Sequence, residues 1–254
     1  MEIPTPVRAT GTHFYRYSGL QHIDWLKPIL HDHELYLPSV SQLNDPLDGR
    51  PLLAPMSEDK MFNFLYMSNR NPTLTGGAQE KMVGTLRYNI HHHGPEELQR
   101  EMAKLFYKHL EGHRIYSLSK RYDNLSLWAK YADGHSGYCL EFANEGEFFE
   151  RAVEVIYGES IPMDVTNPEQ RRAYFLYCKR EEWSNEEEVR VVVLRGGGST
   201  VKIDPRWLTR LILGMKITEA HEKSIRAWCG QRKPELVVVK AYLDELDQTV
   251  KLRA

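Results

Sequence analysis

The sequence predicts an α+β fold, with a mixed, mainly antiparallel sheet and a helical insertion at about residues 56–112. Two runs rich in β-branched or aromatic residues, 12–18 and 189–194, are typical of strands. Between them, residues 56–110 carry apolar stripes at helical spacing. The 254 residues contain no internal repeat and no low-complexity linker, so we expect a single domain over residues 1–254.

Before the insertion, each expected element has its own signal. The aromatic residues of 12–18 favour a strand, and the apolar residues of 20–31 recur at the spacing of a helix. A short strand at 34–38 leads into the segment 39–49, which is dense in turn-forming residues. The helical insertion that follows is broken at 71–77 and at 91–94.

Beyond the insertion, residues 114–120 are expected to form a strand that carries small hydroxyls on one face, and Gly134 closes a helix that begins near residue 125. The triple glycine at 196–198 predicts a hairpin turn, because no helix with Lys-Ser/Thr follows it as a phosphate loop requires. The other expected elements are strands at 136–142, 151–157, 189–194, 200–203, 208–213 and 236–242, and helices at 168–180 and 218–229.

Bulk composition narrows the function classes. The formal net charge of −2 gives no overall basic field for nucleic acid, although a local groove stays possible. The N-terminus lacks the pattern of a secretory signal, and no apolar run approaches the roughly 20 residues of a membrane span. The three cysteines, Cys139, Cys178 and Cys229, are widely spaced and form no CxxC motif. We therefore expect a cytoplasmic protein with reduced thiols and no membrane partner.

The acids that run directly into strand 189–194 are the first candidate catalytic groups. A carboxylate at the start of a buried strand lies on a rigid element at the edge of the core, where a catalytic acid is well placed. Glu186 and Glu188 would share one face of a strand, whereas a bulge would turn Glu187 inward instead. A charged loop before an edge strand is the alternative.

Other polar residues are candidates because of where they lie. Arg16 stands inside an aromatic strand, and a buried arginine needs an anion, either a protein carboxylate or a ligand phosphate. Exposure on an edge strand is the alternative for Arg16. Ser117 and Ser119 leave room for a ligand or form a tight packing seam. Asn44 and Asp45 lie on the loop 39–49 and either border a site or only shape turns. The consecutive histidines 91–93 do not converge on one metal ion from a helix, so we expect no metal there.

A set of motifs covers most of the chain outside roughly residues 52–110: Phe14–Tyr17, Leu35–Ser39, Leu43–Asp48, Ile115–Ser119, Ser126–Ala132, Gly137–Phe142, Lys179, Trp183, Glu186–Arg190 and Leu211–Gly214. As a set they are specific, and they resemble a bacterial family described as a conserved domain of unknown function. Some members of that family accompany phage-defence systems. The family description implies no activity.

The order strand-Arg, strand-Ser-x-Ser, strand-Glu-x-Glu also resembles the layout of ADP-ribosyltransferases. The resemblance implies an enzyme that cleaves NAD, its substrate, and transfers ADP-ribose, as a toxin or in phage defence. It assigns Arg16 to the NAD phosphates or ribose, Ser117 and Ser119 to the nicotinamide pocket, and Glu188 to the ribose and the developing oxocarbenium, with Glu186 as the fallback. The chain departs from the usual motif at Leu118, where threonine is normal.

This resemblance leads to a geometric expectation: Arg16, Ser117 and Glu188 converge on one cleft that Asn44 and Asp45 border. The acceptor stays open among protein, nucleic acid, a small molecule and water. The aromatic residues that stack on nicotinamide or adenine would come from the set Tyr15, Tyr17, Trp128 and Tyr131.

Two alternatives stay open beside the transferase. A metal-dependent nuclease would use acids from the set Asp45, Asp48, Glu141 and Glu188, with Lys179 as a basic helper. The chain lacks the acid–x–Lys strand motif that would favour this activity. A non-catalytic ligand-binding module would pair Arg16 with Glu188 as a buried ion pair and keep the loop 39–49 as a structural turn.

Overall fold

The computed structural model of the protein describes residues 5–69, 76–93, 95–159, 162–164, 167, 174–194 and 198–254. Its main strands are β1 (His13–Ser18), β3 (Arg114–Ser119), β4 (Tyr138–Ala143), β5 (Val153–Glu154), β8 (Glu188–Val193), β10 (Leu208–Leu213), β11 (Val237–Leu243) and β12 (Val250–Arg253). They form an eight-stranded sheet in the order β12-β11-β10-β4-β1-β3-β8-β5. Its strand pairs are antiparallel apart from the parallel pair β10–β11. The expected α+β class with a mainly antiparallel sheet is confirmed.

The helices fall into two groups. The insertion is made of α1 (Glu58–Asn69), α2 (Gly77–His93) and α3 (Pro95–Leu110), while α4 (Leu125–Tyr131), α5 (Gly146–Phe149) and α6 (Glu219–Gly230) pack on the sheet. Two small ribbons pair β2 (Glu34–Tyr36) with β9 (Thr200–Lys202), and β6 (Ile156–Gly158) with β7 (Cys178–Arg180). The short 3-10 or π helices are η1 (Leu20–Trp25), η2 (Pro28–Asp32), η3 (Val40–Gln42), η4 (Tyr174–Tyr177), η5 (Glu181–Glu186) and η6 (Pro205–Trp207).

The register of the central strands assigns side chains to two faces of the sheet. Tyr15 lies opposite Ser119, and Ser119 lies opposite Glu188, so these three residues share one face. Helix α4 covers part of that face. The opposite face carries the largest buried cluster, which includes Phe14, Tyr116, Leu118, Leu140, Val189 and Val191 together with residues of α5 and α6. The apolar side chains Val189 and Val191 of β8 therefore lie on one face of the sheet, and its charged side chains, Glu188 and Arg190, lie on the other.

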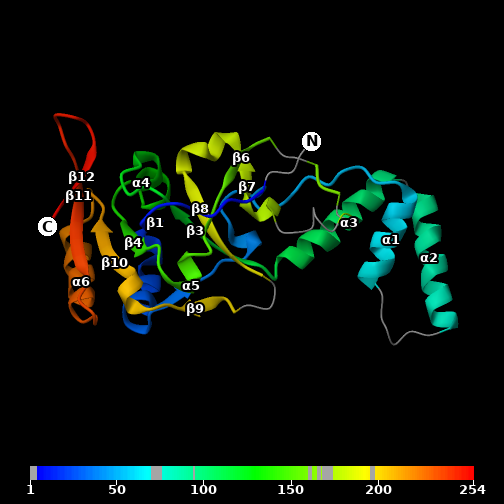
Figure 1. Ribbon diagram of the computed structural model, residues 1–254, viewed down its shortest axis with the longest axis horizontal. Helices are drawn as coiled ribbons and strands as arrows, with labels where there is room; N and C mark the ends of the chain where they lie inside the picture. The colour runs from blue at the N-terminus through cyan, green and yellow to red at the C-terminus, as the bar shows by residue number, and fades with distance from the viewer. Residues whose placement is uncertain are drawn as a thin grey trace.

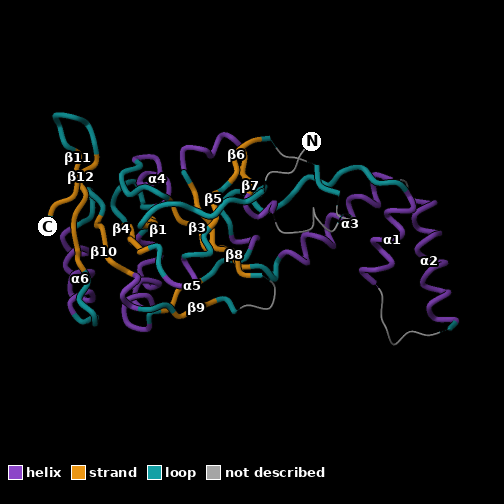
Figure 2. The backbone as a smooth tube through the Cα atoms, viewed as in Figure 1, coloured by secondary structure: helices purple, strands orange, loops and turns teal. Residues whose placement is uncertain are grey.

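The helical insertion has a core of its own that continues into the rest of the chain. Met61, Met102 and Phe106 pack in one buried cluster with Ile115 of β3 and Leu176 of η4. Figure 1 shows α1 and α2 at the opposite end of the molecule from β12, and Figure 2 shows the same separation along the backbone. The expected helical character of residues 56–110 is confirmed over the described helices.

The structure corrects several element predictions. The helix expected at 168–180 is wrong at its end, because residues 178–180 form β7 and pair with β6; residues 168–173 lie outside the described residues. The strand expected at 151–157 is divided between the main sheet and that ribbon. The strand expected at 200–203 pairs with β2 and not with 189–194, so the predicted hairpin is wrong. Of its glycine turn, Gly196 and Gly197 lie outside the described residues. Strand β12 was not predicted.

Gly137 is a position where the fold requires glycine, since a Cβ there would lie 2.2 Å from the Ser18 carbonyl oxygen and 3.0 Å from Ala132 Cα. Both neighbours are backbone atoms that cannot move alone. We expect Gly137→Ala to lower the free energy of unfolding in urea by about 1–3 kcal/mol. The control is Gly84→Ala in α2, where a Cβ meets nothing within 4 Å and alanine is expected to raise it by about 0.5–1 kcal/mol. Equal effects of the two substitutions would contradict this account.

Candidate functional site

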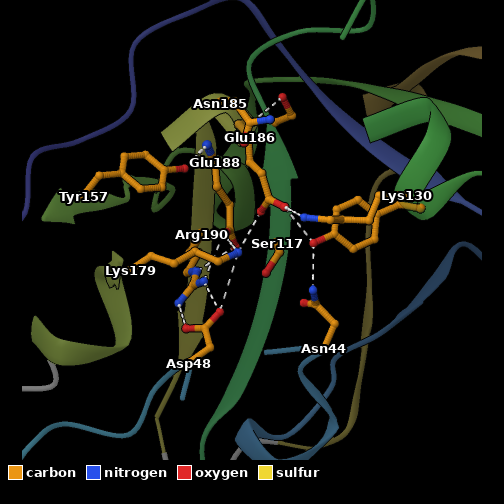
Figure 3. A network of polar contacts seen from close by, with 12 residues as sticks. Asn44, Asp48, Ser117, Lys130, Tyr157, Lys179, Asn185, Glu186, Glu188 and Arg190 are labelled. Atoms are coloured by element: carbon orange, nitrogen blue, oxygen red, sulfur yellow. Dashed lines mark hydrogen bonds and ion pairs between the residues drawn. The ribbon is translucent and has the colours of Figure 1, made fainter. Parts of the chain in front are cut away.

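Arg190, on β8, is the centre of a group of charged side chains (Figure 3), and its own side chain is fully buried. Its Nε and Nη2 donate to the Glu188 oxygens Oε1 and Oε2 at 2.7 and 2.9 Å, and Nη1 and Nη2 donate to Asp48 Oδ1 and Oδ2 at 2.7 and 2.6 Å. Nη1 also donates to the Leu176 carbonyl oxygen at 2.7 Å. These contacts use all five N–H donors of a guanidinium.

Lys179 joins a third acid, Glu186, to this group. Its Nζ donates to Glu186 Oε2 at 2.7 Å and to Glu188 Oε2 at 3.0 Å, and lies 3.8 Å from Asp48 Oδ2. We call Asp48, Lys179, Glu186, Glu188 and Arg190 the ionic cluster. All five residues are buried.

The backbone explains why two acids of the Glu-Glu-Glu run face the same lysine. Glu187, between them, has the left-handed angles φ 44° and ψ 48° at the end of η5. This turn places Glu186 and Glu188 on the ionic cluster, and it leaves the Glu187 carboxylate 3.2 Å from the exposed Arg121. The inward acids are therefore Glu186 and Glu188, as expected, but a turn brings them together and not the alternation of one strand.

A polar chain connects Glu186 with the surface. Tyr131 donates its hydroxyl to Glu186 Oε1 at 2.8 Å, and the Asn44 amide donates to the Tyr131 oxygen at 2.9 Å. Lys130 Nζ lies 3.3 Å from the same Oε1 and 3.6 Å from the centre of the Trp183 ring. Asn44 and Lys130 are exposed, so this side of Glu186 is the rim of the ionic cluster.

Opposite charges within the ionic cluster favour the ionised forms of Glu188 and Lys179. Burial alone would raise the pKa of Glu188, but Arg190 and Lys179 outweigh burial and lower this pKa to about 2. Burial likewise disfavours the charged form of Lys179, yet Glu188 and Glu186 raise its pKa. Burial, followed by the charge of Glu186, raises the pKa of Tyr131, which therefore remains a neutral donor.

The two glutamates differ in the exposure of their partners. Glu188 accepts from Arg190 Nε, Arg190 Nη2 and Lys179, and the nearby Ser117 hydroxyl helps to lower its pKa. A carboxylate offers about four acceptor positions, so these three donors leave Glu188 one position, on a side chain whose partners are all buried. Glu186 accepts from Tyr131, Lys130 and Lys179, which leaves it one acceptor position. Because its partner Lys130 is exposed, Glu186 is the acid that is connected to the surface.

The expected convergence of Arg16 with Ser117 and Glu188 is wrong. The three strands are neighbours, and Ser117 does reach Glu188, but Arg16 belongs to the opposite face of the sheet. Its guanidinium lies over the Tyr116 ring at 5.4 Å and donates to the Ser117 carbonyl oxygen at 2.8 Å. Arg16 follows Tyr15 directly on β1, and successive side chains of a strand point to opposite faces. Arg16 therefore lies on the face opposite Tyr15, Ser119 and Glu188. Arg16 also does not form the ion pair with Glu188 that the binding-module alternative assumed.

Three aromatic residues expected to stack on a ligand have structural contacts instead. Trp128 is fully buried and donates its Nε1 to the Tyr122 carbonyl oxygen at 2.7 Å. Tyr17 is buried edge-on against Trp128, with a centroid separation of 5.2 Å. Tyr15 lies beside Tyr122 and hydrogen-bonds Glu141, away from the ionic cluster. Of the expected stacking residues, Tyr131 alone is bonded to the ionic cluster among the described contacts.

Of the remaining predicted residues, Asn44 is connected to the ionic cluster, whereas the side chains of Asp45 and Ser119 have structural contacts. Asn44 reaches the rim of the ionic cluster through Tyr131, although the cleft that it was expected to border does not form around Arg16. Asp45 accepts from the Leu47 backbone N–H at 2.9 Å, which is a turn contact. Ser119 is buried and donates to the Glu186 carbonyl oxygen at 2.9 Å, so it belongs to the packing seam.

Sequence reasoning assigned no role to Arg190 and considered Asp48 only as a metal ligand. The spacing Glu188-x-Arg190 was a usable signal, because residues two apart on a strand share a face. A buried arginine also requires acids, and Asp48 was an available one. No local signal pointed to Lys130, which meets Glu186 only through the packing of α4 against η5.

The structure brings together Asp48, Glu188 and Lys179, which the nuclease alternative requires, but another side chain occupies the place of the metal ion. The guanidinium of Arg190 lies between the Asp48 and Glu188 carboxylates, where a metal ion would have to bind. Glu141 is elsewhere, hydrogen-bonded to Thr209 at 2.8 Å. Over the described part of the chain, no group of three or more His, Cys, Asp or Glu side chains is arranged to hold a metal ion.

Comparison with known proteins adds no family: no family model, no curated protein and no solved structure matches the chain. Among the helices that the structure describes, none has the combined length and apolar character that crossing a membrane requires.

Proposed function

We propose that this protein binds NAD at the rim of the ionic cluster, through Glu186, Tyr131 and Asn44, and that Arg16 and Glu188 do not contact the ligand. The observation that carries the proposal is the open acceptor position on Glu186, a carboxylate otherwise fixed by three donors. A ribose hydroxyl is a donor of the kind that this position accepts. The exposed amide of Asn44 adds a donor and an acceptor beside it.

Energetics support a binding role for the ionic cluster. Burying charges carries a desolvation penalty, and apolar replacements of similar volume are often neutral or stabilising. Five buried charged side chains are therefore a poor means of adding stability alone. Groups of titratable residues with strongly shifted pKa values gather at functional sites, and the pKa of Glu188 is shifted in this way.

Cleavage of NAD is a second candidate function, favoured by the same open position on Glu186. Breaking the nicotinamide–ribose bond places positive charge on the ribose, and a fixed carboxylate close to that carbon stabilises this charge. The chemistry is the one that the ADP-ribosyltransferase resemblance implies, but with Glu186 in place of Glu188, whose donors are all buried. Its acceptor is open among protein, nucleic acid, a small molecule and water.

The test is titration calorimetry with NAD, followed by an assay for free nicotinamide. We expect Glu186→Gln to weaken NAD binding by about 10- to 100-fold, because a hydrogen bond to a charged group is lost. The matched control is Glu187→Gln, since the adjacent carboxylate pairs with the exposed Arg121 outside the ionic cluster. Melting temperatures of both variants show that the fold survives.

The outcomes separate the two candidates. NAD binding without release of nicotinamide supports the binding function alone. Release that disappears in Glu186→Gln but persists in Glu187→Gln supports cleavage. If the wild type gives no heat with NAD and no shift of melting temperature, both NAD proposals are wrong.

A further inference from the structure

Lys130 is held in the manner of a bound cation. Its ammonium lies 3.6 Å from the centre of the Trp183 ring and 5.6 Å from that of Tyr131, and 3.3 Å from Glu186 Oε1. Two aromatic rings and one carboxylate form the arrangement that recognises organic cations in general. We call Trp183, Tyr131 and Glu186 the cation cage.

The charge balance shows why the cation cage is occupied. The ionic cluster contains three carboxylates, Asp48, Glu186 and Glu188, against the two cations Lys179 and Arg190, which leaves one negative charge. Lys130 supplies the compensating positive charge from the surface. A cationic ligand in the same place would compensate equally well.

Lys130 is able to leave, whereas Lys179 is not. The side chain of Lys130 is 44% exposed and extends from α4 on a flexible stem, so its ammonium regains water when it moves out. The side chain of Lys179 is 3% exposed and lies within 4 Å of three carboxylates. Of the two lysines over Trp183, Lys130 is therefore the exchangeable one.

We propose that the cation cage takes a flat or quaternary organic cation, and that Lys130 is a resident substitute that the ligand displaces. The cation cage is inferred from its own contacts, and only the identity of the ligand rests on the proposed function: in oxidised NAD the group is the positively charged nicotinamide ring. The Trp183 Nε1 is buried and has no hydrogen-bond partner among the described residues. It is a donor for a ligand acceptor such as the carboxamide oxygen.

The experiment compares the 1-methylnicotinamide cation with neutral nicotinamide by calorimetry. Lys130→Met keeps the apolar stem and removes the competing charge, so we expect it to bind the cation about 5- to 30-fold more tightly than the wild type, with no gain for nicotinamide. Lys130→Gln is the second variant in case methionine perturbs folding, which the melting temperature reports. Lys120→Met is the control, because Lys120 is also part-exposed and paired with a glutamate, Glu154, but lies outside the cation cage.

The two proposals fail separately. Binding of 1-methylnicotinamide that tightens in Lys130→Met, without any binding of NAD, supports the cation cage and overturns the proposed function. NAD binding with no affinity for the small cation, in wild type or in either Lys130 variant, overturns the cation cage alone. The double variant Lys130→Met with Trp183→Leu is the last comparison. If it binds 1-methylnicotinamide as tightly as Lys130→Met does, the cation cage is also overturned, because the Trp183 ring then contributes nothing to binding.

Discussion

Arg190→Met is expected to lower the free energy of unfolding by about 3–5 kcal/mol, because it leaves the buried Asp48 and Glu188 carboxylates without their main partner. Arg190→Lys is expected to recover only part of this loss, since an ammonium cannot reproduce the five donors of the guanidinium fork. Urea denaturation at pH 7 measures both variants against the wild type.

The control is Arg121→Met, which also removes an arginine with two carboxylate partners, Asp123 and Glu187. The side chain of Arg121 is 50% exposed, and we expect a loss of only about 0–1 kcal/mol. A rescue variant combines Arg190→Met with Asp48→Leu and Glu188→Met, and keeps the pair of Lys179 with Glu186. It is expected to regain most of the stability. A loss for Arg190→Met no larger than that for Arg121→Met would show that the ionic cluster is not held by Arg190.

Acid is expected to remove the contribution of Glu188 to stability. Its pKa is about 2 in the folded protein, below the ordinary value of 4.5, because Arg190 and Lys179 outweigh the opposing effect of burial. Between these two pH values the unfolded chain binds more protons at this site, so stability falls as the pH falls. The contribution is complete above about pH 5 and lost towards about pH 2, and it amounts to about 3 kcal/mol.

The measurement is the free energy of unfolding in urea, from pH 7 down to the lowest pH at which the folded state survives. Glu188→Gln is expected to be less stable than the wild type at pH 7 and to lose less stability on acidification, because glutamine binds no proton in this range. Parallel pH profiles of wild type and Glu188→Gln would show that Glu188 titrates at its ordinary pKa.

The sequence could predict much of the fold and only part of the candidate site. Runs such as Val189–Val193 determine a strand because β-branched residues suit a half-buried pleated backbone. The stripes of 56–110 determine helices because their period matches 3.6 residues. By contrast, residues 178–180 became a strand through pairing with β6, a contact that no local pattern encodes.

For the site, the sequence by itself determined that Glu186, Glu188 and Ser117 stand on elements at the edge of the core. The tertiary structure decided their partners. The sheet register put Arg16 on the apolar face. Chain folding brought Asp48 into contact with Arg190, which is 142 residues away in sequence. The left-handed Glu187 then aimed both neighbouring acids at Lys179. The physical reason is that side-chain periodicity specifies backbone angles and exposed faces, whereas charge pairing depends on which strands and loops meet in space.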